Sequence, residues 1–389
     1  MATSLRLLRF NLPLMFNSTL RNTVGGTFSF GVKRFIFTNK TIGMNNYEYV
    51  RTQVHQQFIN VEESFRKKMK EIVEDENSVV FTEDLKAMSH LVTSNPDDID
   101  LFVKMIYKFN SQSSDLRFGN YSFGPVIMRA FNYVGKPDIA LSTFLDPKLA
   151  SFYDQSTSYS VLVTLLYNNK MYSEVRQVYD IFKSRCVDLQ NVPRIPVIVT
   201  AAACYQENTP ESFNYLLNVW KELSQHNFPP LRRFITLLGG LALKQNSPQI
   251  TLELMSLIRT RYIDNRCMKI LAFCKLNRLN DVAFILKSSL EGTYSIKETY
   301  FADVIEEVEK HLDDKDDELK SIITKLISLM KVQGHIEETT LESHILSPIE
   351  YLFSKRSKNQ ITDRGNENRN EPFFRSPQRK RIVGLKDLI

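Results

Sequence analysis

The sequence has few of the residues that make tight turns. Its 389 residues include 13 glycines and 14 prolines, whereas all-β domains need many Gly- and Pro-rich turns between short strands. It also lacks an apolar run of about 18 residues, so no membrane-spanning helix is expected. Hydrophobic residues make up 43% of the chain and charged residues 24%, which is typical of a folded soluble protein.

Catalytic and metal-binding patterns are also missing. The four cysteines form no CxxC pair and have no histidine cluster nearby: Cys186, Cys204, Cys267 and Cys274. They are best interpreted as buried free thiols in a reducing compartment. The six histidines are scattered, and no nucleophile elbow, HExxH, phosphate loop or dinucleotide fingerprint occurs. We therefore expect no enzyme activity, no metal and no cofactor.

Positive charge is concentrated at the two ends of the chain. Residues 1–47 contain six basic residues and no Asp or Glu, and residues 354–389 contain 10 basic and 4 acidic residues. The N-terminal segment is Arg-bearing, rich in Ser and Thr and free of acids, which is typical of a mitochondrial transit peptide. We therefore expect a location in the mitochondrial matrix, with residues 1–40 as the transit peptide and cleavage near residues 36–42. The polar, basic tail at 354–389 is expected to be disordered.

A pair of short amphipathic helices can be recognised in the middle of the chain. Residues 157–183 read TSYSVLVTLLYNNKMYSEVRQVYDIFK. Each half has apolar residues at helical spacing, namely Tyr159, Leu162, Val163 and Leu166, then Val175, Val178, Tyr179 and Phe182. The polar Asn168-Asn169-Lys170 separates the halves. A single pair of this size buries too little apolar surface to be stable, so it should have neighbours of the same kind.

Copies of the second helix of this pair recur along the chain. Anchor positions 140, 175, 212, 251 and 282 are separated by 35, 37, 39 and 31 residues. Helix pairs at such a period indicate an all-α fold, an α-solenoid of degenerate helix-turn-helix repeats. The alternative is an irregular all-α domain with accidental spacing. We expect an N-terminal helical segment at 41–80, the repeat array at 81–297 with its best copy at about 156–190, and an acidic C-terminal helical cap at 298–353.

The best copy resembles a pentatricopeptide repeat. Tyr159 and Leu162 match the family pattern, while Lys170 at the Gly-like turn and Val175 at the small position depart from it. The blocks LRFGNYSFGPVIMRAF, STSYSVLVTLLY and PESFNYLL resemble family members of animal mitochondria. The resemblance covers roughly residues 80–300. It implies a right-handed solenoid with a role in RNA maturation and respiratory-chain function.

The resemblance also implies where RNA bases would be read. In this family, the residue after the Tyr-like position and the last residue of each repeat face the RNA. The polar candidates at these positions are Ser160 with Asn191, and Thr236 with Tyr262. Pro125 and Val197 stand at equivalent positions and cannot read a base edge. Alternatively, Ser160 and Thr236 are ordinary polar residues near helix starts.

A basic stretch indicates where phosphates would bind. Residues 232–297 contain 11 basic and 4 acidic residues, and clustered Lys and Arg interleaved with aromatic rings favour nucleic-acid binding. The phosphate-contact candidates are Arg232, Arg233, Arg259, Arg261, Arg266, Lys269, Lys275 and Arg278. The expected partner is single-stranded mitochondrial RNA such as an mRNA precursor, with a separate nuclease or the mitoribosome as a further partner. The alternative is a protein-interaction scaffold that does not read RNA.

Overall fold

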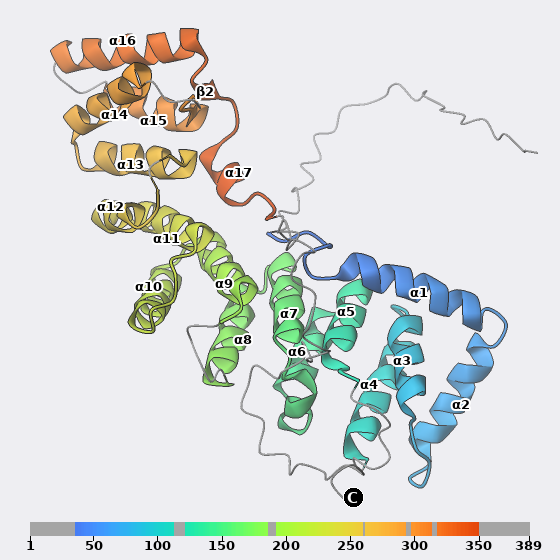
Figure 1. Ribbon diagram of the computed structural model, residues 1–389. Coiled ribbons are helices and arrows are strands. Elements are labelled where there is room, and N and C mark those ends of the chain that lie inside the picture. Colours follow the sequence, from blue (N-terminus) through green and yellow to red (C-terminus); the bar gives the residue numbers. More distant parts are fainter. Residues whose placement is uncertain are drawn as a thin grey trace, which may run out of the picture. The chain divides into compact units, whose positions relative to one another are not determined.

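The structure is a computed structural model that describes residues 36–112, 121–185, 192–259, 261–292, 297–312 and 317–349. Nearly all of the regular structure in these residues is helical (Figure 1). The N-terminal half contains α1 (Met44–Phe58), α2 (Glu62–Glu74), α3 (Thr82–Leu91), α4 (Pro96–Ser111), α5 (Gly124–Val134), α6 (Pro137–Leu145), the 3-10 helix η2 (Pro147–Tyr153), α7 (Ser156–Asn168) and α8 (Tyr172–Arg185).

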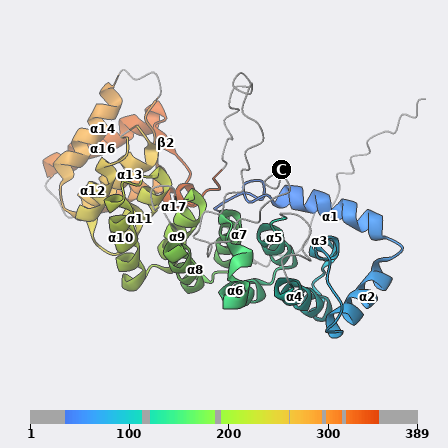
Figure 2. The same ribbon diagram turned by 60° about the horizontal axis from the view of Figure 1, so that its bottom comes forward.

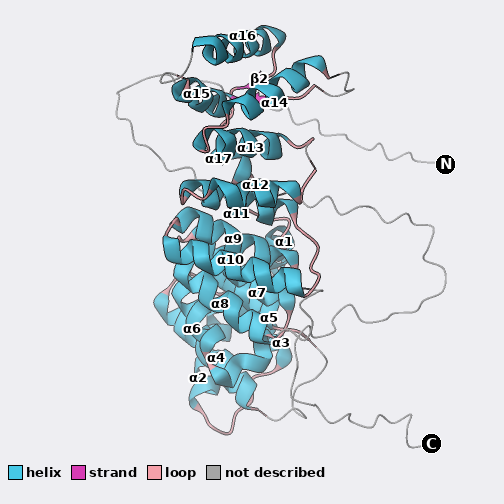
Figure 3. Ribbon diagram, turned by 90° about the vertical axis from the view of Figure 1, so that its left-hand side faces the viewer, coloured by secondary structure: helices cyan, strands magenta, loops and turns pink. Residues whose placement is uncertain are grey.

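The C-terminal half continues with helices and two short strands. It contains α9 (Arg194–Glu207), α10 (Pro210–Gln225), α11 (Arg232–Lys244), α12 (Pro248–Ser256), α13 (Ile263–Lys275), α14 (Leu279–Glu291), β1 (Tyr300–Phe301), α15 (Ala302–His311), α16 (Asp317–Gln333), β2 (Ile336–Glu337) and α17 (Leu341–Ile345). The strands β1 and β2 pair in parallel and are the magenta segment in Figure 3.

Successive helical hairpins stack on one another through their first helices. Each odd-numbered helix from α3 to α15 packs against the next odd-numbered helix, and the even-numbered helices flank this row. This is the arrangement of an α-solenoid, in which each repeat contacts its neighbours. The predicted fold class is therefore confirmed. The anchor positions 140, 175, 212, 251 and 282 all lie in the second helices of hairpins, α6, α8, α10, α12 and α14.

The turn inside each hairpin repeats with the same backbone conformation. A residue in the left-handed region follows α5, α7, α9, α11 and α13, namely Gly135, Lys170, Asn208, Asn246 and Asn277, with φ between 52° and 67°. Glycine and asparagine adopt this conformation readily, but lysine does so at a cost of about 1–2 kcal/mol. Lys170 thus differs in residue type from the glycine or asparagine of the other turns, but its backbone has the same conformation.

Aromatic packing joins neighbouring hairpins at the repeat that the sequence shows best. The ring of Tyr159 is fully buried. It makes edge contacts with Phe144 of α6 at 5.0 Å and with Phe182 of α8 at 4.9 Å between ring centroids. One side chain of the repeat pattern therefore holds three helices together, and such pairs add about 0.5–1.5 kcal/mol to the burial of apolar area.

The cysteines whose surroundings are described agree with the sequence-based expectation. Cys204, Cys267 and Cys274 are free thiols buried in α9 and α13. Burial raises the pKa of each thiol to about 12, so these side chains stay protonated and unreactive at neutral pH. Cys186 lies outside the described residues.

Both ends of the described chain return to the row of odd-numbered helices. Helix α1 packs on α3 and α5 (Figure 2), and Phe37 forms a parallel bridge with Ile349. After α16, the chain turns back through β2 and α17, and α17 packs on α11 and α13. The expected acidic cap at 298–353 thus contains α15 and α16, and its end returns to the array. The tail at 354–389 and most of the expected transit segment lie outside the described residues.

The mature protein is expected to retain Ile36 and Phe37. Both side chains are 1% exposed, and the Ile36 carbonyl accepts a hydrogen bond from the Ile349 amide at 2.8 Å. Cleavage after residue 40 would remove both buried side chains. We therefore expect cleavage no later than the bond that precedes Ile36, at the N-terminal edge of the interval that the sequence favours.

A chain that begins at residue 41 should be less stable than one that begins at residue 36. Two buried side chains of this size contribute about 1.5–3 kcal/mol each, so the loss should be about 3–6 kcal/mol. Chemical denaturation of the two chains measures the difference. Equal free energies of unfolding would show that the bridge to Ile349 contributes nothing.

Replacing Lys170 with glycine should stabilise the protein. The Lys170→Gly substitution relieves the left-handed strain but adds freedom to the unfolded chain, for a net gain of about 0.5–1 kcal/mol. Asn277→Gly is the matched control, because asparagine already tolerates this conformation. Thermal denaturation compares the two variants with the natural chain, and a destabilised Lys170→Gly variant would contradict the strain argument.

Candidate nucleic-acid interface

The two hydroxyl groups predicted to face bases are buried in the structure. Ser160 is 6% exposed, and its hydroxyl donates to the carbonyl of Ser156 at 2.9 Å. Thr236 is fully buried, and its hydroxyl lies 2.8 Å from the Arg232 carbonyl and 3.2 Å from an oxygen of Asp264. Both groups thus bond within the protein, as the alternative interpretation of helix-start residues expects. Asn191, the predicted partner of Ser160, lies outside the described residues.

Two arginines flank a tyrosine ring where α11 and α13 begin. Tyr262 immediately precedes α13, and the guanidinium carbon of Arg232 lies 4.4 Å from its ring centroid. The guanidinium carbon of Arg261 lies 5.6 Å from the same ring. The arginines are exposed and the tyrosine is half-buried. An aromatic ring with cations close by combines a surface on which a base can stack with groups that contact phosphates.

Arg233, next to Arg232, is used inside the protein. Its guanidinium donates to the carbonyls of His344 at 2.8 Å and Ile345 at 2.7 Å, and to the hydroxyl of Ser347 at 3.1 Å. Burial lowers the pKa of Arg233, although an arginine stays charged at any physiological pH. The sequence-based role of Arg233 as a phosphate contact is therefore replaced by a role in holding α17.

Arg266 is likewise committed to contacts within the chain. It is 8% exposed and donates to the carbonyls of Arg261 at 2.8 Å and Thr299 at 3.0 Å. It also lies 3.4 Å from a carboxylate oxygen of Glu298. Such a side chain links α13 to the segment that leads into β1, and its charge is already compensated.

The remaining predicted cations lie in two separate places. Arg259 is exposed just before Arg261. Lys275 and Arg278 lie at the other end of α13, where Lys275 donates to Asn246 at 2.9 Å and Arg278 to Asp281 at 2.7 Å. A helix of this length spans about 20 Å, so the two groups of cations form separate places on the surface. Lys269 lies between them, half-buried, and desolvation lowers its pKa.

The first turns of α9 and α11 carry positive charge, which is unusual for helix starts. Arg194 is the first residue of α9, Arg232 is the first residue of α11, and neither helix has an acidic residue in its first turn. Cations are unfavourable at a helix N-terminus, where the helix dipole is positive. A violated local rule often marks a functional position. Sequence reasoning overlooked Arg194, although its position directly after Pro193 marks a helix start.

We define the basic edge as four exposed arginines at these helix starts and the half-buried tyrosine beside them: Arg194, Arg232, Arg259, Arg261 and Tyr262. They belong to, or directly precede, three consecutive odd-numbered helices, α9, α11 and α13. The arrangement offers four cations and one aromatic ring to a negatively charged chain.

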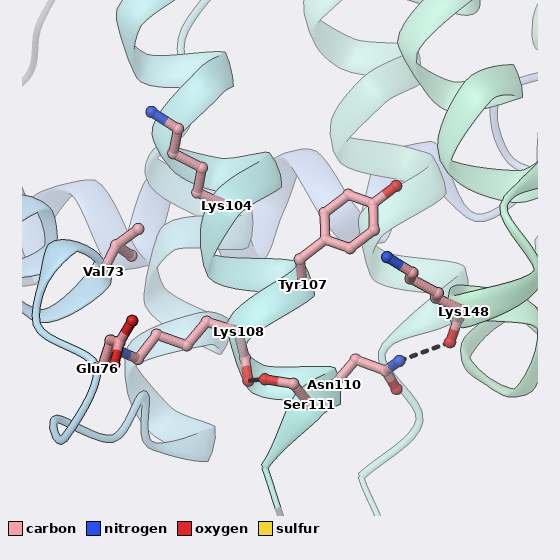
Figure 4. Close-up of a pocket in the computed structure, with 8 residues that line it drawn as sticks. All are labelled: Val73, Glu76, Lys104, Tyr107, Lys108, Asn110, Ser111 and Lys148. Carbon is pink, nitrogen blue, oxygen red and sulfur yellow. Dashed lines mark hydrogen bonds between the residues drawn. The ribbon is translucent and has the colours of Figure 1, made fainter.

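A cavity beside α4 is less suited to an anion than the basic edge. It has a volume of about 920 Å³ and is lined by Lys104, Tyr107, Lys108 and Lys148, among others (Figure 4). Lys104 pairs with Asp100 at 2.7 Å, Lys108 donates to the Ile72 carbonyl at 2.8 Å, and Glu76 also lines the space. Most of its positive charge is thus compensated locally.

The described part of the chain offers neither a metal-ligand cluster nor a membrane-spanning helix. Within it, no three His, Cys, Asp or Glu side chains gather in a way that could hold a metal ion. None of the described helices is long and apolar enough to cross a bilayer.

The fold and the basic edge define a helical-repeat protein with a candidate nucleic-acid interface. The chain is similar to proteins called "Pentatricopeptide repeat-containing protein 2, mitochondrial". It is 22% identical to that of Pongo abelii over 349 residues, 85% of this chain and 89% of the relative. It is 24% identical to that of Mus musculus over 288 residues (73% and 74%) and 23% identical to that of Homo sapiens over 319 residues (80% and 80%).

The similarity confirms the resemblance seen in the repeat blocks, and the relatives' names confirm the predicted mitochondrial location. No family model matches the chain, and no solved structure matches it.

The adjacent residues Arg233 and Arg232 should differ sharply in their effect on stability. Arg233→Ala leaves buried carbonyls of α17 without a donor and should cost about 1–3 kcal/mol. Arg232→Ala removes a side chain that is 41% exposed and lies 3.8 Å from a carboxylate oxygen of Asp264, so it should cost about 1 kcal/mol or less. Urea denaturation measures both, and equal effects would contradict the assignment of Arg233 to α17.

Proposed function

We propose that this protein is a mitochondrial matrix RNA-binding protein that supports the maturation or stability of transcripts and thereby respiratory-chain function. Similarity to pentatricopeptide repeat proteins supports a role with RNA. The observation that carries the proposal is the exposed Arg232–Tyr262–Arg261 stack on the basic edge. The protein acts by positioning or protecting RNA, while a separate nuclease performs any cleavage.

The proposed ligand is a single-stranded RNA such as an mRNA precursor. Guanidinium groups bind phosphate oxygens in a bidentate manner, and their binding releases counterions from the RNA. Tyr262 supplies a face on which an unpaired base can stack, which contributes about 1–3 kcal/mol. A double helix hides its base faces, so this site favours single strands.

A protein-interaction scaffold, for instance one associated with the mitoribosome, is the second candidate. The observation in its favour is an apolar stripe on α16, where Ile322, Leu329 and Val332 are 44%, 49% and 85% exposed. Exposed apolar surface of this kind can mark a protein contact. The basic edge lies on other helices, so the two functions are compatible.

Reversing two charges of the basic edge should weaken RNA binding. Arg232→Glu combined with Arg261→Glu should raise the Kd for a single-stranded RNA of about 20 nucleotides by about tenfold or more near 0.1 M salt. The slope of log Kd against log salt should also fall by about 1.4, because about two phosphate contacts are lost. Fluorescence anisotropy over a salt series measures both quantities.

The matched control reverses two exposed lysines elsewhere, Lys287→Glu and Lys325→Glu, which makes the same change in net charge. Arg266 is left unchanged, because its buried guanidinium donates to carbonyls within the chain. Arg232 lies 3.8 Å from a carboxylate oxygen of buried Asp264, so circular dichroism first confirms that the variant with Arg232→Glu and Arg261→Glu is folded. If the control pair lowers affinity as much as the edge pair, binding follows net charge, and the basic edge is not the site.

A further inference from the structure

The odd-numbered helices carry the base-facing positions that the repeat resemblance implies, yet two other segments of the described chain pack on these helices. We define the clasp as residues 36–43 and 336–349. We propose that the clasp occupies this face while RNA is bound, so that RNA lies outside it along the basic edge. RNA is then held by its phosphates and by stacking, and it is not read base by base. This inference rests on the proposed function and specifies its ligand class: single strands of broad sequence.

The short helix α17 packs against α11. Near the last residue of α11, Lys244 pairs with Glu342 at 3.1 Å. In the middle, Ile345 approaches Gly240 so closely that a Cβ atom there would lie 3.7 Å from it. At the second residue of α11, Arg233 holds the carbonyl of Ile345. Residues Glu342 and Ile345 of the clasp therefore contact α11 at its start, middle and end.

The same segment is fixed to the helices that follow α11. The Leu341 amide donates to a carboxylate oxygen of Asp303, at the start of α15, at 2.9 Å. The His344 ring lies 5.1 Å from the ring of Phe301 in β1. Strand β2 extends the contact by pairing with β1. The apolar side chains of the segment, Leu341, Ile345 and Leu346, are buried, which is the packing of a permanent structural element.

The N-terminal part of the clasp covers the earlier helices. The Ile349 amide donates to the carbonyl of Ile36 and so joins the two parts. Further along, the Ile42 carbonyl accepts a hydrogen bond from Arg129 of α5 at 2.9 Å. Thr41 and Ile42 lie beside the starts of α7 and α9, next to Ser160 and Arg194. The clasp thus extends from α15 to α5.

The candidate RNA-contacting side chains differ in their exposure to solvent. Ser160 and Thr236 are 6% and 0% exposed, and their hydroxyls are already bonded to the Ser156 carbonyl and to the Arg232 carbonyl and Asp264, so neither is free to bond a base. Arg232 and Tyr262 remain accessible, and the side chain of Arg232 is 41% exposed. Contacts to phosphates and to one base face carry little sequence information. RNA bound in this way should therefore show weak sequence preference.

A reversible lock tests whether the clasp must open. The double variant Phe37→Cys/Ile349→Cys places two thiols at the paired positions of the bridge. The reduced form of the same protein controls for any effect of the substitutions on folding. Binding of oligo(U) and oligo(C) of about 20 nucleotides is measured by anisotropy for both forms.

We expect the oxidised and reduced forms to bind each oligonucleotide with Kd values within about twofold, and oligo(U) and oligo(C) to differ by less than about fivefold. A loss of about tenfold or more on oxidation would show that the clasp opens to admit RNA, and it would overturn the inference. A discrimination of about a hundredfold between the two oligonucleotides would also overturn it, because it would require base readout.

Thiol labelling tests the closed face without RNA. Thr236→Cys and Arg232→Cys, each combined with Cys186→Ser, are compared for their rate of reaction with a maleimide. The thiol of Thr236→Cys should react at least about a hundredfold more slowly than the thiol of Arg232→Cys, because position 236 is buried. Similar rates would show that the clasp is open in solution. Absence of RNA binding in the natural chain would instead remove the proposed function, and the labelling result does not depend on it.

Discussion

The structure depends on covering helices that are apolar on every side. Ten consecutive residues of α9, Pro196–Tyr205, are buried, and so are ten of α11, Phe234–Leu243. A helix that is hydrophobic all round needs neighbours on every face. The flanking hairpins and the even-numbered helices cover part of α11, and α17 covers another part. The clasp therefore completes the core of the repeat array, and its position follows from the composition of these helices.

The arginines of the C-terminal half fall into two sets: some are bonded inside the protein, and others lie on its surface. Arg233 and Arg266 donate to backbone carbonyls of the returning segment and of the turn before β1. Buried carbonyls without donors would be costly, so these two side chains are structural. Arg232 and Arg261 remain outside and share the ring of Tyr262. At the start of α11, Arg233 therefore stabilises the fold, while its neighbour Arg232 belongs to the candidate interface.

The sequence correctly predicted the features that depend on local residue spacing, namely helices and turns. It located the second helices of five hairpins because apolar residues at helical spacing identify a buried face. It also predicted the turn at Lys170, whose left-handed conformation recurs in every one of these hairpins. The resemblance in the repeat blocks was confirmed by relatives that cover most of the chain.

Long-range contacts could not be predicted in this way. Residues 336–349 were assigned to an acidic cap because their composition says nothing about a partner about a hundred residues earlier, as in the contact between Arg233 and Ile345. The burial of Ile36 depends on Ile349 for the same reason. Charge counting likewise placed Arg266 and Arg261 in one group, since a count cannot distinguish a compensated guanidinium from an exposed one.

The most direct measurement is to map the residues that touch RNA. Ultraviolet crosslinking of a bound single-stranded RNA, followed by mass spectrometry of the crosslinked peptides, identifies these residues in the intact protein. The account predicts crosslinks at Tyr262 and its neighbours on the basic edge. Crosslinks centred on residues beneath the clasp, at Ser160 or Thr236, would contradict it and would show that the repeat face itself receives the RNA.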